Sequence, residues 1–492
     1  MASGQEQSVP VKRGHASVDV LVVGSGVAGL AAALEAARGG ARVNVLECEA
    51  TYGGASILSG GGCCIVGSPV QESCGILDDP HLALTDWTKR GGGAADLDWA
   101  DRYLRASRAE VYDWLAELGV GWEPRLVWQA GNTVPRWHKP RGGGGAVMAA
   151  LRRELDRLCG RGGVRVNASA RRLVTRGPDV VGVELESDGS TEVLSAPATI
   201  VATGGFVSNR AMLAEQARHY GPLPHLLSGS GPSTLGRGHR LLAEVGAQFS
   251  HMSLIWFYPV GTPDPVDPAG RRGLMVRGVR DEVWVNAEGR RFCDEHQRGH
   301  SEGGSALLNQ PGQFSWGIID AVGIEDLVLA NNGYYGDSEN TIPSRRLEFL
   351  TGSSHVRRAD SIEDLARAIG VASAALVQTI ASYNHAIAAR LPADPQTGKD
   401  LRDARPINQP PYTAIRYQPL AQKNLGGVLT DLHCAVLTAD SVPVPGLYAA
   451  GEVAGMAGGH INGASGLEGT MFGPCLYSGR VAGAAAVGKS VR

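Results

Sequence analysis

A short segment near the N-terminus, residues 20–47, constrains the fold of this chain more than any other stretch. It reads VLVVGSGVAGLAAALEAARGGARVNVLE. The apolar residues 20–23 predict a buried parallel strand, the alanine-rich stretch predicts a helix, and residues 41–47 predict a second strand that ends in Glu47. A strand, a helix and a strand around a G-x-G-x-x-G turn form a βαβ unit that binds a dinucleotide.

Each glycine of this turn has a separate expected role. Gly24 makes the tight turn, Gly26 lets the backbone approach a pyrophosphate, and Gly29 permits close helix packing. The helix N-terminus supplies N–H groups and a positive dipole end to the anion, and Glu47 accepts hydrogen bonds from a ribose. The alternative, an ordinary glycine-rich turn, is disfavoured because the strand, the helix, the second strand and the acid occur together.

A second glycine-rich segment favours a flavin over a nicotinamide. It reads CEATYGGASILSGGG, follows Glu47 directly, and has no role in a plain NAD domain. Its small residues let the backbone lie against a pyrophosphate and a flat ring, while Ser56 and Ser59 offer hydroxyl groups. Two further glycine turns, in residues 198–206 and 446–455, repeat this design. We expect all three turns to converge on one ligand.

These motifs resemble those of the fumarate reductase/succinate dehydrogenase flavoprotein superfamily, which includes soluble fumarate reductases and 3-ketosteroid dehydrogenases. The matching segments follow the family's order and are VVGSGVAGLAAALEAA, YGGASILSGGG, VATGGFVSNR, VNAEGRRFCDE, GLYAAGEVAG and GTMFGPCLYSGRVAG. The segment CCIVGSPVQESCGILDD resembles the steroid and small-molecule dehydrogenases more than the respiratory subunits. The resemblance implies an α/β fold: a Rossmann-like FAD-binding domain of the glutathione reductase type, interrupted by an α+β capping domain, with the substrate between them.

The expected domain boundaries follow changes in the character of the chain. Residues 1–17 read as a disordered leader, and residues 18–252 as the N-terminal part of the FAD-binding domain. Prolines, aromatic residues and charged turns indicate the capping domain over residues 253–422. The FAD-binding domain resumes over residues 423–492.

Local patterns predict helices in both domains. Residues 82–120 have the apolar spacing of helices, and the stretch AVMAALRRELDRLC predicts a helix after the glycine-rich loop 135–145. In the cap, Ser361 and Asp364 form a capping pair at the start of a helix.

The cofactor that the resemblance implies is FAD, held without a covalent bond. Succinate dehydrogenase-type relatives attach their flavin through a histidine that precedes a threonine, and the matching pair here is Ala55-Ser56. Neither side chain forms that linkage, so tight binding depends on hydrogen bonds and on burial of the flavin ring. The residues expected to contact FAD are Gly24, Gly26, Val27, Ala28, Gly29, Glu47, Gly53, Gly54, Ala55, Ser56, Ser59, Gly60, Gly61, Gly62, Ala170, Thr203, Gly204, Gly205, Gly451, Glu452, Gly466 and Leu467.

Hydride exchange at a flavin requires a protein group that moves a proton at the neighbouring substrate carbon. The family pattern gives three catalytic candidates, Tyr258, Arg298 and His460. Arg298 lies one residue early relative to the proton-delivering arginine of fumarate reductases. Each candidate has a plainer interpretation: Tyr258 as hinge packing, Arg298 as an ion-pair partner of Asp294 or Glu295, and His460 as a polar loop residue.

The positions expected to bind substrate depart from the fumarate reductase pattern. Those enzymes hold a substrate carboxylate with an arginine where this chain has Gly466, and they keep a histidine where it has Lys423. Arg277 lies in the segment that carries their proton relay, without its glutamate. Loss of the guanidinium removes the clamp that a dicarboxylate requires. We expect Gly466 to leave room for a bulkier, less charged substrate, with Lys423 and Arg277 as further substrate contacts.

The expected function is that of an FAD-dependent oxidoreductase acting on CH-CH groups. As a dehydrogenase or ene-reductase, it would act on a C–C bond next to a carbonyl in a small, bulky or hydrophobic molecule, with hydride transfer at flavin N5 and proton transfer by tyrosine or arginine. The alternative on the same fold is an amine or amino-acid oxidase, or a flavoenzyme without net redox change such as an isomerase. The electron acceptor or donor is unknown.

Composition agrees with a globular cytoplasmic enzyme. The chain has 492 residues, of which 43% are hydrophobic and 19% charged, and its net charge of −3 gives no sign of a nucleic-acid partner. No apolar run is long enough for a membrane span, and no C-x-x-C-H motif indicates haem. The adjacent Cys63 and Cys64 read as small apolar fillers, with redox activity as the alternative. His296 and His300 have the spacing of a zinc pair but lack its glutamate, so no metal is expected.

Overall fold

The computed structural model describes residues 18–126, 128–129, 131–265, 267, 269–296, 300–325, 327–330 and 342–491, so the expected leader lies outside the described residues. Contacts divide the chain into two compact units. The first comprises Met1–Met212, Gly231–Leu254 and Asn424–Arg492, and the second comprises Leu213–Ser230 and Ile255–Lys423. Residues 213–230, which were expected in the FAD-binding domain, pack with the second unit.

A six-stranded sheet forms the centre of the first unit, in the order β20-β21-β9-β1-β2-β5. Strand β1 (Val20–Val23) pairs in parallel with β2 (Val43–Leu46) and with β9 (Ala198–Val201). All four residues of β1 are buried, as expected for a strand that is covered on both faces. The other strands are β5 (Val164–Arg165), β20 (Ala435–Leu437) and β21 (Pro443–Ala449).

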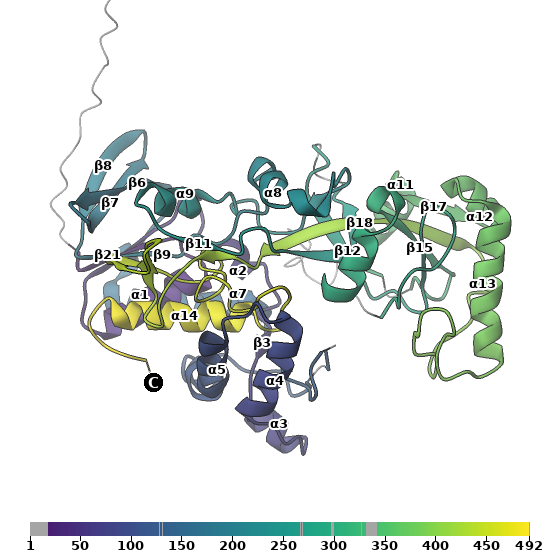
Figure 1. Cartoon of the computed structure of the whole chain (residues 1–492), viewed down its shortest axis with the longest axis horizontal. Helices are drawn as coiled ribbons and strands as arrows, with labels where there is room; N and C mark the ends of the chain where they lie inside the picture. Colours follow the sequence, from purple (N-terminus) through teal and green to yellow (C-terminus); the bar gives the residue numbers. More distant parts are fainter. Residues whose placement is uncertain are drawn as a thin grey trace, which may run out of the picture. The chain divides into compact units, whose positions relative to one another are not determined.

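Helices α1 (Val27–Arg38) and α14 (Phe472–Ala485) pack on each other with their backbones close together (Figure 1). A Cβ atom at Gly479 would lie 2.2 Å from the carbonyl oxygen of Ala28, and one at Gly483 would lie 2.1 Å from that of Ala32. Glycine permits this approach because it has no side chain. The contact fixes the direction of α1, whose N-terminus follows the glycine turn.

The helical segment expected over residues 82–120 is divided into shorter pieces. Helix α4 (Pro80–Gly91) ends at Gly92, which has a left-handed φ of 62°. Helix α5 (Leu97–Ala106), the π-helical turn η1 (Ser107–Asp113) and α6 (Trp114–Glu117) follow. The apolar spacing therefore predicted the helical conformation correctly, but it did not show that the glycine run after α4 divides the segment into separate helices.

A three-stranded antiparallel sheet lies next in the chain: β6 (Ala168–Arg176), β7 (Asp179–Ser187) and β8 (Ser190–Ser195). The remaining elements of residues 18–254, together with β19, are α2 (Gly54–Ile57), β3 (Cys63–Cys64), α3 (Pro69–Ser73), β4 (Trp137–His138), α7 (Gly143–Cys159), η2 (Arg161–Gly163), α8 (Arg210–Gln216), η3 (Arg218–Tyr220), β10 (Leu227–Ser228), α9 (Arg237–Glu244), β11 (Phe249–Ser250) and β19 (Gly427–Val428).

The second unit is built on a sheet in the order β14-β15-β18-β12-β13-β16. The long strand β18 (Tyr412–Asn424) pairs antiparallel with β15 (Ser315–Ile319) and with β17 (Val356–Ala359). The other elements are β12 (Ile255–Pro263), β13 (Gly273–Arg277), β14 (Val283–Val285), η4 (His300–Gly304), α10 (Ser305–Leu308), η5 (Pro311–Gln313), β16 (Val328–Ala330), α11 (Ile342–Gly352), α12 (Ile362–Ile369) and α13 (Ser373–Ala388). Ser361 caps α12 by accepting a hydrogen bond from the Asp364 N–H at 3.1 Å, which confirms the predicted capping pair.

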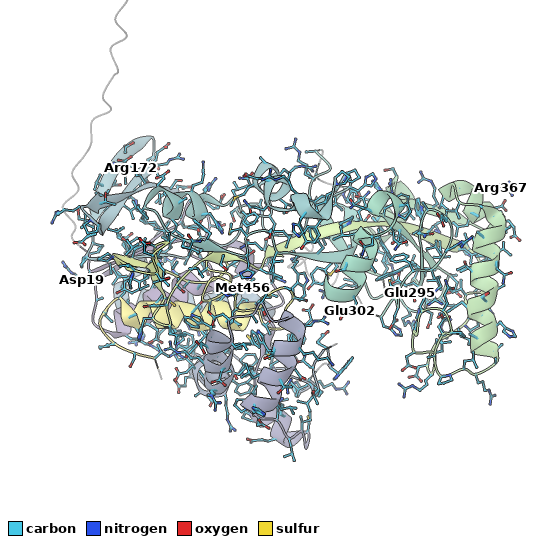
Figure 2. The ribbon with its side chains drawn as sticks, in the orientation of Figure 1. Asp19, Arg172, Glu295, Glu302, Arg367 and Met456 are labelled. Atoms are coloured by element: carbon cyan, nitrogen blue, oxygen red, sulfur yellow. The ribbon has the colours of Figure 1, made fainter. Side chains whose placement is uncertain are left out.

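Glu295, labelled in Figure 2, lies in a buried ion-pair cluster of the second unit. Arg291 donates two hydrogen bonds to the Glu295 carboxylate, at 2.8 and 2.7 Å, and the Lys399 ammonium lies 3.5 Å away. Burial opposes ionisation of Glu295, yet the hydrogen bonds from Arg291 and the nearby Lys399 charge hold its pKa below the usual value. Among the described residues, no helix has the length and apolar character needed to cross a membrane.

Candidate cofactor and active site

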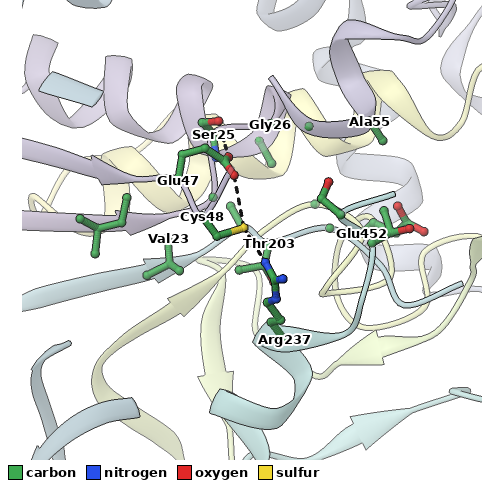
Figure 3. A pocket seen from close by; sticks show the side chains of 18 of the residues that line it. Val23, Ser25, Gly26, Glu47, Cys48, Ala55, Thr203, Arg237 and Glu452 are labelled. Carbon is green, nitrogen blue, oxygen red and sulfur yellow. Dashed lines mark hydrogen bonds between the residues drawn. The ribbon is translucent and has the colours of Figure 1, made fainter. Parts of the chain in front are cut away.

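A cavity in the first unit lies outside the carboxyl ends of the parallel strands β1, β2, β9 and β21 (Figure 3). This is where ligands bind in open α/β sheets. Of the residues expected to contact FAD, those that line it are Gly24, Gly26, Val27, Ala28, Glu47, Gly54, Ala55, Ser56, Ala170, Thr203, Gly204, Gly451 and Glu452. The glycine turns of three distant segments therefore meet at one cavity.

The three glycines of the first turn are needed for different reasons. Gly24 has a φ of +103°, and a Cβ there would lie 2.4 Å from the Ala202 carbonyl oxygen. A Cβ at Gly29 would lie 1.9 Å from the Gly24 carbonyl oxygen. At Gly26 the nearest atom is the Ser56 Oγ at 3.4 Å, an ordinary contact. Protein packing therefore demands glycine at positions 24 and 29, whereas at Gly26 it leaves space beside the helix N-terminus.

The N-terminus of α1 supplies the anion-binding part of the cavity. Gly26 is its N-cap and brings no side-chain hydrogen bond, and no acidic residue lies in the first turn. The Val27 N–H donates to the Ser56 hydroxyl oxygen at 3.0 Å. Helix N–H groups and the positive dipole end at such a site favour a phosphate.

Glu47 is tied to the glycine turn rather than extended into solvent. Its carboxylate accepts from the Ser25 hydroxyl at 2.5 Å, from the Ser25 N–H at 3.1 Å and from the Glu49 N–H at 3.0 Å (Figure 3). Only 6% of Glu47 is exposed. The Cys48 thiol, a weak donor, also lies 3.4 Å from this carboxylate. The bonds together fix the orientation of the carboxylate, and a ribose hydroxyl would replace the weak thiol contact.

Arg237 and Cys48 also line the cavity, and the sequence analysis named neither of them as a contact. The Arg237 Nη1 atom donates to the Cys48 Sγ atom at 2.8 Å (Figure 3). Burial and the neighbouring Glu47 carboxylate raise the pKa of the Cys48 thiol to about 12. No motif marked Arg237 because α9 lies far along the sequence from the phosphate turn. The other cavity residues outside the sequence prediction are Val23, Ser25, Leu46, Ala168, Ser169, Ala202, Ser233, Thr234, Leu241 and Cys475.

The third glycine turn is held by Asn424, a fully buried residue that the sequence did not single out. Its side chain accepts from the Phe206 N–H at 3.2 Å and donates to the Gly426 carbonyl at 2.7 Å. A Cβ at Gly205 would lie 2.2 Å from the Asn424 Oδ1 atom. Gly205 therefore packs against this buried amide and does not line the cavity, whereas its neighbour Gly204 does.

The glycine run from Ser59 to Gly62 does not line the cavity either. The Gly144 N–H at the start of α7 donates to the Ser59 carbonyl at 2.9 Å. A Cβ at Gly62 would lie 2.1 Å from the Trp137 Nε1 atom. Protein packing therefore accounts for Gly61 and Gly62, which lie close to the start of α7 and to β4, whereas a Cβ at Gly60 would meet no atom within 4 Å. Gly29 and Gly53, which were also expected to contact FAD, lie outside the cavity lining as well.

Gly466 corrects one physical argument of the sequence analysis. A Cβ there would lie 2.7 Å from both the Asn462 Oδ1 and the Thr470 Oγ1 atoms. The space next to Gly466 is therefore filled by protein, and glycine there does not leave room for a substrate. The Gly466 carbonyl accepts a long hydrogen bond from Arg90 at 3.4 Å. Neither Gly466 nor Leu467 lines the cavity.

His460 stacks on His251, with ring centroids 4.5 Å apart and planes inclined by 25°. Burial, and then the neighbouring His251, lower the pKa of His460, so this imidazole is neutral over most of the physiological range. Its Nδ1 atom has no hydrogen-bond partner within the described part of the chain. A neutral, half-buried imidazole is suited to hydrogen bonding or proton transfer.

Tyr258 and Lys423 lie close together in the second unit. The Lys423 Nζ atom is 5.8 Å from the centre of the Tyr258 ring and 5.4 Å from that of Trp256. Tyr258 and Trp256 are two residues apart on β12, and their ring centroids are 5.9 Å apart. The structure thus joins one catalytic candidate to one substrate candidate. Arg298 lies outside the described residues.

The remaining candidates have ordinary surroundings. Arg277 lies at the exposed end of β13, where its Nε atom is 3.0 Å from the Met275 sulfur. Cys63 and Cys64 are fully buried, and burial raises the pKa of both thiols, that of Cys64 to about 12. Thiols of this kind are protonated and unreactive, in keeping with the interpretation as apolar fillers.

The cavity residues fit FAD. The uncapped start of α1 suits a pyrophosphate, Glu47 suits a ribose, and the backbone at Gly26 lies open to a close approach. The Thr203 hydroxyl is a buried polar atom of the lining without a hydrogen-bond partner among the described residues. A ligand that carries oxygen and nitrogen groups would satisfy it.

Comparison with known proteins agrees with this geometry. A family model described as an FAD binding domain matches residues 19–471. The chain is 30% identical to a KsdD-like steroid dehydrogenase of Mycobacterium tuberculosis, in an alignment that covers 95% of both chains. It is 28% identical over 500 residues to a fumarate reductase (cytochrome) of Shewanella frigidimarina, covering 97% of this chain and 78% of the other.

Solved structures give the same placement. The 3-ketosteroid-delta4-(5alpha)-dehydrogenase of Rhodococcus jostii is similar with a TM-score of 0.74 and 26% identity, over 96% of this chain and 97% of that one. The fold is also shared with the 3-ketosteroid delta1-dehydrogenase of Sterolibacterium denitrificans, with a TM-score of 0.79 at 21% identity over 96% and 99% of the two chains.

This chain belongs to the FAD binding domain family, as an FAD-dependent oxidoreductase of the fumarate reductase and ketosteroid dehydrogenase type that acts on CH–CH groups. The predicted family, fold class and FAD dependence are confirmed. The relatives support this activity and not the alternative of an amine oxidase or an isomerase.

Proposed function

We propose that this enzyme dehydrogenates or reduces a C–C bond next to a carbonyl group in a bulky, largely hydrophobic molecule of the 3-ketosteroid kind. The observation that carries this proposal is the packing at Gly466, where Asn462 and Thr470 fill the space that a carboxylate-binding arginine side chain would enter. A dicarboxylate without its guanidinium clamp loses its strongest contact. The steroid dehydrogenases among the relatives supply the substrate class.

Bound FAD supplies a flat ring that takes up or releases a hydride. The start of α1 holds the pyrophosphate, and Glu47, oriented by Ser25, holds the ribose. Tyr258 takes up or gives the proton at the substrate carbon next to the hydride position. Lys423 keeps a positive charge beside the Tyr258 ring, which stabilises negative charge that develops during this transfer. Arg298 and His460 are the other candidates for proton transfer, and Arg277 remains a candidate substrate contact.

The FAD is held without a covalent bond. Ala55 and Ser56 line the cavity at the place where a histidyl linkage would form, and the Ser56 hydroxyl already accepts a hydrogen bond from the Val27 N–H. Cys48 and Cys475 are the cysteines of the lining, and Cys48 has a strongly raised pKa. Denaturation in acid should therefore release all of the flavin into the supernatant. Yellow colour that stays with washed, precipitated protein would contradict this part of the proposal.

An anaerobic titration tests the proposed reaction. A saturated 3-ketosteroid should bleach the flavin of the oxidised enzyme with loss of two hydrogen atoms, or its unsaturated counterpart should reoxidise the reduced enzyme. Succinate and fumarate should do neither at a useful rate. Fast turnover of fumarate together with inert ketosteroids would overturn the proposal. A panel of dyes and quinones then identifies the class of the electron partner. The composition supports a cytoplasmic enzyme, which fractionation of the source cells tests.

A further inference from the structure

The order of the lining residues along the cavity indicates which part of FAD each of them would contact. The start of α1 binds the pyrophosphate, and Glu47, at the end of β2, binds the ribose. Cys48 follows Glu47 directly, and Arg237 contacts Cys48. In FAD, the adenine is attached to this ribose, on the side away from the pyrophosphate. Arg237 therefore stands at the adenine end of the cavity (Figure 3).

The surroundings of α9 direct Arg237 into the cavity. Gly236, with a φ of +71°, is the N-cap of α9, and a Cβ at Gly238 would lie 2.0 Å from the Thr203 Oγ1 atom. The start of this helix is thus pressed against the turn after β9. Arg237, between these two glycines, lines the cavity, whereas Arg240 on the next turn is exposed.

The charge of Arg237 is available to a ligand. Its hydrogen-bond acceptor at 2.8 Å is the Cys48 thiol, whose raised pKa keeps it neutral, so the contact does not cancel the guanidinium charge. The Glu49 carboxylate lies 3.7 Å away and is 48% exposed, which makes this ion pair weak. The Arg237 side chain is itself 35% exposed, so it can adjust when a ligand enters.

We infer that Arg237 binds the adenine ring of FAD, and that it thereby selects an adenine dinucleotide. A guanidinium is planar and stacks on aromatic faces, and it only donates hydrogen bonds, which suits the acceptor nitrogens of adenine. Cys48 positions the guanidinium through its sulfur atom. This inference concerns the cofactor and is independent of the proposed substrate.

Binding of FAD, ADP and UDP to the deflavinated full-length chain tests the inference. ADP and UDP carry the same ribose and phosphates and differ only in the base. Arg237→Ala should weaken FAD and ADP by about tenfold and leave UDP unchanged, since one cation–π or charged contact is removed. Arg240→Ala removes the same charge from the same helix and should change none of the three.

Two results would overturn the assignment: unchanged ADP binding in Arg237→Ala, or an equal loss of ADP and UDP, which would place the guanidinium on the phosphates or the ribose. Arg237→Gln guards against a folding defect, because it keeps a polar side chain with an amide donor but removes the charge and the planar guanidinium. If Arg237→Ala does not fold, the same ADP and UDP comparison in Arg237→Gln decides between these outcomes. The flavin released from each purified variant gives a second readout that does not depend on activity.

Discussion

The Ser25 hydroxyl donates to the Glu47 carboxylate at 2.5 Å, and this bond joins the phosphate turn to the end of β2. The Gly53 N–H in turn donates to the Ser25 oxygen at 3.0 Å, so the second glycine turn is tied to the same point. A single serine thus connects the first glycine turn, Glu47 and the second glycine-rich segment. The dinucleotide motif allows any residue at this position, yet the structure gives it a defined role.

Glu47→Gln should lower the affinity for FAD by about tenfold or more, because the charge-assisted bonds to the ribose and to Ser25 are weakened together. Isothermal titration of FAD into the deflavinated chain measures the effect. Ser25→Ala should show a smaller loss of the same kind. Wild-type affinity in Glu47→Gln would remove this residue from the cofactor site.

Gly26→Val and Gly29→Ala should fail in different ways. Gly26→Val should fold and lose FAD, because the space beside Gly26 is open in the protein but is needed by the pyrophosphate. Gly29→Ala should lower the free energy of unfolding by about 2 kcal/mol or more, since its Cβ would overlap the Gly24 carbonyl. Flavin content and thermal unfolding separate the two effects. A Gly26→Val protein that retains full FAD would refute the placement of the pyrophosphate.

Gly466→Ala should destabilise the protein by about 1–3 kcal/mol, because its Cβ would press on Asn462 and Thr470. Gly352→Ala, with no atom within 4 Å of the new Cβ, is the matched control and should be nearly neutral. Gly466→Arg should not create fumarate reduction, since no space exists there for the side chain. Denaturant unfolding and a fumarate assay check these outcomes, and gain of fumarate turnover would contradict the packing argument.

Acid should destabilise the fold through His239. Burial between Phe206 and Phe249 lowers the pKa of His239 to about 4, and neither ring nitrogen has a hydrogen-bond partner among the described residues. The unfolded chain therefore binds the proton first. As the pH falls from about 6.5 to about 4, stability should drop by about 3 kcal/mol from this residue alone, and above pH 7 it should contribute no slope.

His239→Phe should reduce that slope, because phenylalanine keeps the aromatic packing without a titrating group. His433→Gln, an exposed position, should leave the slope unchanged. The measurement is the free energy of unfolding against pH for the three proteins. Equal slopes in wild type and His239→Phe would show that other groups control acid lability.

Tyr258→Phe should slow flavin reduction by at least about 100-fold while leaving FAD content intact, since general acid–base catalysis contributes this much. Lys423→Met should produce a smaller loss with a changed pH profile, because it removes the charge beside the Tyr258 ring. Tyr412→Phe, on another strand of the second unit, is the control. Anaerobic stopped-flow measurements report the rates, and an unimpaired Tyr258→Phe would direct attention to His460 or Arg298.

The sequence predicted the βαβ unit almost to the residue, because strand, turn and helix are each encoded locally. The bounds of β1 agree with the structure, and β2 ends at Leu46, one residue before the predicted end at Glu47. The capping pair at Ser361 could be predicted equally well, because it depends on two residues that are three positions apart in the sequence. The pieces of helix between residues 82 and 120 show the limit of such reasoning: apolar spacing does not reveal where a glycine run interrupts it.

The features of the site that could not be predicted from the sequence depend on tertiary packing. Arg237 and Asn424 reach the site from segments without a motif, so only the fold brings them there. The run from Ser59 to Gly62 looked like a ligand cradle, but two of its glycines, Gly61 and Gly62, accommodate the start of α7 and Trp137. A glycine that faces a cofactor and a glycine that faces a neighbouring helix have the same appearance in a sequence.

The glycine contacts between α14 and α1 have a consequence for the synthesis of this protein. The helix that presents its N-terminus to the phosphate is supported along its length by Gly479 and Gly483, more than 440 positions later in the chain. A nascent chain that has completed the β1–α1–β2 unit still lacks this support. Stable capture of FAD should therefore require that α14 has been synthesised and has packed against α1.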